Sequence, residues 1–191
     1  VHTKKMHLLV VDEALTDYHH LHPVAGSKPG TFTTSFTPAK EGNYKAWIEI
    51  TIYGAHQFLT VKLKGAKPCS APCIDRQISD TGVSNGLKAA VSFETPLQVD
   101  TATMGTIKIT DTAGNPVTDL EPVMGAFAHI VGFHDDFQSI VHVHPMGKEP
   151  MTQEERGGPD LSFHIEPEKA GYLRLYAQLR RHGQDIFIPF G

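Results

Sequence analysis

The sequence predicts an all-β protein made of two antiparallel β-sandwich units that are related by an internal repeat. Short runs rich in β-branched and aromatic residues, such as 30–36, 43–52 and 171–179, recur along the 191 residues and are predicted strands. Turn-forming residues separate these runs, as in EGN at 41–43 and HGQ at 182–184. Sustained helical periodicity is missing, and the best helical candidate is the short segment 152–156. Evenly spaced short strands are typical of immunoglobulin-like or cupredoxin-like sandwiches.

The repeat is clearest where residues 6–23, MHLLVVDEALTDYHHLHP, align without a gap with residues 128–145, AHIVGFHDDFQSIVHVHP. The identical positions in this window are three histidines and one proline. The match resumes after a loop that is longer in the second copy, so the repeated units cover approximately 6–62 and 128–191. A repeat kept only for packing would preserve apolar and turn positions, whereas imidazoles need polar partners when they are buried.

The same alignment suggests a division of the chain into a first sandwich unit at 1–66, a connector at 67–83 and a second sandwich domain at 84–191. Only six residues precede His7, so the first unit lacks the strands that precede the repeat in the second domain. Those strands are either absent or supplied by another segment or chain, and an unpaired edge would favour a homodimer. The connector carries Cys69 and Cys73, which are compatible with a disulfide, a redox or metal pair, or free thiols.

The repeated histidines have the spacing of metal ligands. Two of them stand two residues apart in each unit, and alternate residues of a strand project from the same face. The third lies 13 residues upstream of the first of these, across a turn, where an adjacent antiparallel strand is expected. Three imidazoles on a rigid sheet suit copper, zinc or nickel. The predicted ligands form one set per unit: His7, His20 and His22, and His129, His142 and His144.

Other histidines are weaker candidates for these sites. In a regular strand His19 points away from His20 and His22, and it is therefore expected to lie outside their site. His164 lies on a predicted strand and could reach the second set, although a structural role is the simpler expectation. Trp47 and Tyr176, which the repeat aligns, are expected to anchor the cores of their units.

The patterns HLLVV…HHLHP…GTFTTSF…GNYKAW and GAFAHIVGF…HVHPMG…LSFHIEPEKAGYLRLYAQL resemble a family of bacterial secreted or periplasmic β-sandwich proteins associated with heavy-metal, chiefly copper, handling. The likeness covers nearly the whole chain except the cysteine-containing connector. It implies a periplasmic or secreted location, copper as Cu(I) or Cu(II), and the six repeated histidines as metal-facing residues. A metal-trafficking protein would be the corresponding partner.

Composition excludes several classes of function. The net charge is −4, and 17 Lys and Arg are scattered among 21 Asp and Glu without a basic stripe, which argues against nucleic-acid binding. No apolar run of 18 residues is present, so no membrane span is predicted. The chain also has neither a Gly-x-Ser-x-Gly nucleophile motif nor a phosphate-binding glycine loop.

The function predicted from the sequence is extracytoplasmic metal binding, with copper as the preferred ion, for sequestration, delivery or resistance. Two alternatives remain open. One is a three-histidine metalloenzyme, either a zinc hydrolase or a copper redox enzyme, in which Asp135, Asp136 or Glu166 would act as acid or base. The other is an adhesive or structural sandwich module whose histidines are incidental or pH-responsive. No catalytic residue is predicted.

Overall fold

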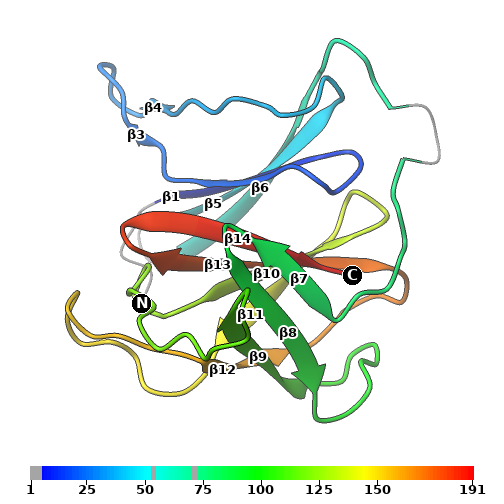
Figure 1. The fold of residues 1–191 in the computed structure, drawn as a ribbon. Coiled ribbons are helices and arrows are strands. Elements are labelled where there is room, and N and C mark those ends of the chain that lie inside the picture. The colour runs from blue at the N-terminus through cyan, green and yellow to red at the C-terminus, as the bar shows by residue number, and fades with distance from the viewer. Residues whose placement is uncertain (1–5, 53–54, 70–72) are drawn as a thin grey trace. The chain divides into compact units, whose positions relative to one another are not determined.

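The computed structural model describes residues 6–52, 55–69 and 73–191, and all regular elements in these ranges are β-strands, as Figure 1 shows. The predicted all-β class is confirmed. The chain divides into two compact units, His2–Asp75 and Arg76–Gly191. Within the described ranges there is no helix long and apolar enough to cross a membrane.

The first unit is built on one four-stranded antiparallel sheet with the order β2-β1-β5-β6. A separate two-stranded ribbon joins β3 to β4. The prediction of a strand at 30–36 is wrong for most of its length, because residues 31–35 are exposed and have no face to bury. The strands are β1 (Met6–Asp12), β2 (Tyr18–Leu21), β3 (Val24–Ala25), β4 (Phe32–Thr33), β5 (Tyr44–Ile52) and β6 (Ala55–Leu63).

The second unit is one eight-stranded antiparallel sheet with the order β14-β13-β10-β11-β12-β9-β8-β7. Its edges approach each other, since the backbones of Ser79 and Gly191 exchange N–H···O bonds of 2.6 and 3.0 Å. The sheet therefore folds over and nearly closes, as expected for a sandwich. The strands are β7 (Thr81–Ser84), β8 (Leu87–Phe93), β9 (Thr103–Asp111), β10 (His129–His134), β11 (Ile140–Pro145), β12 (Asp160–Ile165), β13 (Leu173–Arg181) and β14 (Gln184–Phe190).

The inner face of this folded sheet carries the main apolar core. Alternate residues of β8 and β9 are buried, which is the pattern of strands with one solvated face. Fully buried side chains of this core come from five different strands and include Leu87, Ile109, Phe163, Leu179 and Ile188. The core therefore brings early strands of the unit, such as β8, into one cluster with its last strand, β14.

The internal repeat is present in the topology and in the register. The order β2-β1-β5-β6 of the first unit corresponds to β11-β10-β13-β14 of the second. Leu9 pairs with His20 and Trp47, and its counterpart Val131 pairs with His142 and Tyr176. The predicted core anchors of the two units are both buried. Strands β7, β8, β9 and β12 have no counterpart in the four-stranded sheet that the described residues form.

The predicted helical candidate at 152–156 is not a helix. Turns and bends cover residues 151–154. The Glu155 carboxylate accepts the backbone N–H groups of Met151 and Thr152 at 2.7 and 3.2 Å, and this closes the segment into a loop. Local side-chain hydrogen bonds of this kind compete with helix formation.

Strand β7 lies in residues that the sequence assigns to the connector and to its boundary. A short run containing Gly82 and Ser84 has low β propensity. Tertiary proximity explains the strand, because a Cβ atom on Gly82 would lie 2.3 Å from the Pro189 carbonyl oxygen of β14. A glycine is thus required for β7 to approach β14.

We expect Gly82→Ala to destabilise the second unit by about 1–3 kcal/mol, because the added methyl group forces the two sheet edges apart. Urea unfolding followed by circular dichroism measures the effect. Val83→Ala on the same strand is the matched control, because Val83 is 63% exposed and its truncation should cost less than about 0.5 kcal/mol. Equal stability of the Gly82 variant and the wild type would contradict the close approach.

A second prediction concerns His134, which ends β10 and is buried. Burial lowers the pKa of its imidazole, against the opposing effect of Asp136 and Asp135. Below the ordinary imidazole pKa of about 6.5, the unfolded chain therefore binds more protons at this position than the native state. Stability rises with pH wherever the unfolded state binds more protons, so this histidine should reduce the free energy of unfolding as pH falls from about 7 to 5.

Replacing His134 by Gln or by Phe removes the titration in two different packing contexts. Both variants should lose less stability than the wild type over that pH range in urea unfolding, whatever their absolute stability. A slope of stability against pH that is unchanged in both variants would contradict the prediction.

Candidate metal centre

The hairpin of β1 and β2 brings together the three histidines predicted for the first unit. Leu9 pairs with His20, and the pleat of β1 places His7, two residues earlier, on the same face. His22 follows β2 directly, one register step beyond the pair Leu8–Leu21, which puts it opposite His7. The expected juxtaposition is therefore present.

The geometry of this cluster suits a metal ion. Nδ1 of His7 lies 3.1 Å from Nε2 of His20. The ring of His22 has its centroid 4.9 Å from that of His7 and 4.8 Å from that of His20. One ring nitrogen from each histidine lies within 4.8 Å of the other two. Nitrogens bonded to a tetrahedral ion at about 2.0–2.1 Å stand about 3.3 Å apart, so His7 and His20 already have the required spacing.

The cluster combines a rigid ligand with accessible ones. His7 is only 5% exposed, whereas His20 and His22 are half-buried. Burial restricts the rotamers of His7 and so fixes the direction of its ring. The two more exposed rings border the solvent, from which an ion can enter. Chemically, the arrangement can hold a cation through imidazole nitrogens.

His19 lies outside the cluster, as predicted. Its register partner is Val10, whose side chain belongs to the small apolar core on the opposite face of the sheet. The His19 ring lies 4.8 Å from that of Phe36, and its Nε2 is 3.1 Å from a carboxylate oxygen of Asp17.

Asp17 and Tyr44 join the end of the hairpin turn to β5 through a hydrogen bond from the tyrosine hydroxyl to the carboxylate. Burial raises the pKa of Asp17, but hydrogen bonds from Tyr44 and the Ala39 N–H outweigh it and hold the pKa below its ordinary value. Burial and the bond to Asp17 raise the pKa of Tyr44 to about 12. Both groups therefore keep the protonation states that this bond needs around neutral pH.

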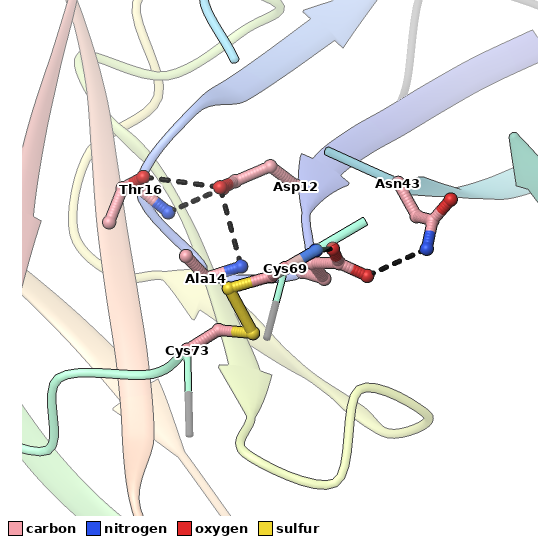
Figure 2. The surroundings of a disulfide bond; sticks show 7 residues. Asp12, Ala14, Thr16, Asn43, Cys69 and Cys73 are labelled. Carbon is pink, nitrogen blue, oxygen red and sulfur yellow. Dashed lines mark hydrogen bonds between the residues drawn. A yellow bond between two sulfur atoms is a disulfide. The ribbon is translucent and has the colours of Figure 1, made fainter. Parts of the chain in front are cut away.

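The Asp12 carboxylate organises the turn between β1 and β2, and Figure 2 shows its contacts with Thr16 and Ala14. It accepts the backbone N–H groups of Thr16 at 2.6 Å, Asp17 at 2.8 Å and Ala14 at 3.3 Å. Leu15 completes the turn in the left-handed region, at φ 58°. The turn sets the register of the hairpin and thereby the position of the histidines.

The second predicted set is only partly described. His129 has Nε2 at 2.9 Å from the Val123 carbonyl oxygen, so Nε2 donates and a metal could bind only at Nδ1. Ligating histidines commonly make such an outer bond. His144 is exposed and pairs in register with His164 of β12. The side chain of His142 lies outside the described residues, so this second set remains a prediction.

A cluster that the sequence analysis did not assemble lies beside the same turn. Cys69 and Cys73 form a disulfide, with their Cα atoms 5.9 Å apart. One carboxylate oxygen of Glu13 lies within 4.8 Å of both sulfur atoms. The cysteine spacing made the disulfide one of the open alternatives, but nothing in the sequence connects Glu13 to the cysteines 56 and 60 residues later.

The chain belongs to the family described as domain of unknown function DUF8832, whose family model matches residues 1–66 and 82–191. The unmatched residues, 67–81, contain the cysteine pair. No curated protein and no solved structure matches the chain.

We expect Asp12→Ala to lower the free energy of unfolding of the first unit by about 2 kcal/mol or more, because several charge-assisted hydrogen bonds are lost at a buried position. Urea unfolding measures the loss. Thr16→Val, which removes only the hydroxyl contact at 3.2 Å, is the matched control and should cost about 0.5–1 kcal/mol. An Asp12 variant no less stable than this control would show that the carboxylate does not hold the turn.

Proposed function

We propose that this DUF8832 protein is an extracytoplasmic copper-binding protein that sequesters or delivers the ion through His7, His20 and His22. The observation that carries the proposal is the convergence of the three imidazoles, two of them with ring nitrogens 3.1 Å apart. In the structure His7 and His20 share a hydrogen bond. A bound cation would replace it by bonds from the imidazoles to one common ion.

The donor set favours copper among the ions that imidazoles bind. All three donors are neutral nitrogen ligands, which suit copper, zinc and nickel. For sites of this type the affinity order of divalent ions places Cu²⁺ above both Ni²⁺ and Zn²⁺. The resemblance to copper-handling sandwich proteins supports the same choice. Zinc and nickel are the competing ions in the test below.

Two features support handling of the ion outside the cytoplasm. The half-buried rings of His20 and His22 allow exchange with solvent or with a trafficking partner. The Cys69–Cys73 disulfide supports a periplasmic or secreted location, because disulfides persist in oxidising compartments.

Calorimetric titration of metal-free, disulfide-bonded protein with Cu(II) tests the proposal. The double variant His20→Ala/His22→Ala should weaken binding at one site by about 100-fold or more, since even an outer-shell change at a metal site costs 10–100-fold. His19→Ala is the matched control, because His19 is adjacent in sequence but faces the other core, and it should bind as the wild type does.

The same titration separates the remaining possibilities. His142→Ala/His144→Ala should remove a second Cu(II) site if the second set also binds. Parallel titrations with Zn(II) and Ni(II) should give weaker binding at the first site. Unchanged stoichiometry and affinity in the His20/His22 variant would overturn the proposal, and tighter binding of zinc would overturn the choice of copper.

A further inference from the structure

We propose that Cys69, Cys73 and Glu13 form a separate metal site for a thiophilic cation, Zn(II) or Cu(I), which becomes available when the disulfide is reduced. The site is distinct from the histidine cluster and does not depend on the proposed function. It also lies partly outside the residues that the family model matches.

The carboxylate of Glu13 is fixed in place beside the sulfur atoms. Glu13 is half-buried in the turn after β1. One of its oxygens accepts the side-chain N–H of Asn43 at 2.8 Å, and the other accepts the backbone N–H of Cys69. Figure 2 shows the cysteine pair next to Asn43 and the Asp12 turn. Each carboxylate oxygen has a second lone pair, which can bind a cation without breaking these bonds.

Contacts that do not involve sulfur hold this part of the connector. The Gly65 N–H donates to the Asn43 side chain at 3.1 Å, and the Lys67 N–H donates to the Glu41 carbonyl at 3.0 Å. Gly65 lies so close to Gly42 that an added Cβ would stand 1.9 Å from the Gly42 carbonyl oxygen. Cys69 should therefore keep its position after reduction.

The disulfide itself is a weak structural constraint. It links residues only four apart in sequence, and the loop-closure contribution of a disulfide is smallest for short loops. Stabilisation of the fold therefore does not explain why the disulfide lies beside the Glu13 carboxylate. Cys69 is exposed, so a thiol reductant can reach the bond.

Charge explains why the cluster favours either oxidation or a metal. Two thiolates and a carboxylate with ligand atoms within 4.8 Å of one another would repel strongly. Oxidation to the disulfide removes two of these charges. A cation instead compensates them, and thiolate sulfur is the donor that Zn(II) and Cu(I) prefer. The carboxylate thus disfavours free thiolates and favours a bound metal.

The site forms in two steps, reduction of the disulfide and binding of the cation. Two thiol molecules reduce the Cys69–Cys73 bond, which yields two cysteine thiols and one disulfide of the reductant. The cation then displaces the two thiol protons, and it forms two metal–sulfur bonds and one metal–oxygen bond to Glu13. Zinc–sulfur bonds of about 2.3 Å in a tetrahedral site would place the sulfur atoms about 3.8 Å apart. Three protein ligands leave the fourth tetrahedral position to water, as in catalytic zinc sites.

In the second unit, the acidic residue at the position equivalent to Glu13 also contacts the connector. Asp135 is the counterpart of Glu13. The Glu13 N–H donates to the Asn43 carbonyl, just before β5, and the Asp135 N–H donates to the Tyr172 carbonyl, just before β13. Asp135 binds Arg76 at 2.7 Å, so this acid holds a cation in the second unit. In the first unit the same position faces sulfur instead.

The experiment compares oxidised protein with protein reduced by dithiothreitol and desalted under anaerobic conditions. Each form is titrated with Zn(II) or with Cu(I) against a competing chromophoric chelator. Reduction should add one bound ion per chain in the wild type. Cys69→Ser/Cys73→Ser should show no gain, and Glu13→Gln should weaken the added site by about tenfold or more.

Glu41→Gln is the matched control, because it neutralises a neighbouring acid that pairs with Lys67 and leaves the cluster intact. Alkylation of the reduced wild type gives a second way to block the sulfur atoms if the serine variant misfolds. An equal stoichiometry before and after reduction, or a gain that survives alkylation, would overturn the proposal. The histidine sites are present in both redox forms. Metal binding to the oxidised protein therefore tests the histidine sites, and only the gain on reduction tests the cysteine site.

Discussion

Cross-strand pairing of Leu9 with His20 decides which way every ring of the histidine cluster points. Because side chains alternate along a strand, a slip of one residue in this hairpin would turn His20 to the opposite core and replace it by His19. The Asp12 carboxylate and the left-handed Leu15 prevent the slip by closing the turn at one length. The candidate metal centre is therefore a consequence of turn chemistry as much as of the histidines themselves.

The β1–β2 and β10–β11 hairpins have the same turn conformation, but equivalent positions in them carry side chains with different roles. Leu15 and Phe137 occupy the same left-handed position, at φ 58° and 52°. The residue that ends the first strand is Asp12 in one unit, where it accepts turn N–H groups, and His134 in the other, where it is buried. The backbone conformation of the repeat is thus compatible with different side-chain chemistry at equivalent positions.

The units also differ in how they are stabilised. The second unit folds a sheet over a large apolar core, whereas the first unit buries apolar side chains on both faces of its sheet: Val10, Tyr44 and Ala46 on one, and Leu9, Val11 and Trp47 on the other. His7 is buried on the face of Leu9 and Val11, where a polar group is costly. Metal binding would supply stability to the native state of this unit by mass action.

Much of the fold could be read from local pattern. The predicted runs 43–52 and 171–179 have strong β propensity and clear turn signals, and they coincide closely with β5 and β13. Strand β7 and the irregular segment at 30–36 could not be predicted, because both depend on what a neighbouring segment buries. The disulfide remained one of several alternatives until the positions of Cys69 and Cys73 were known.

The candidate site divides in the same way. By itself, the sequence determined the all-β class and the repeat, and it predicted two sets of histidines, because strand alternation and repeated spacing are properties of the chain alone. The tertiary structure alone decided that His7 and His20 meet at 3.1 Å and that Glu13 faces the cysteines. Such contacts depend on hairpin register and on hydrogen bonds that fasten distant segments together, and neither leaves a signal at fixed sequence spacing.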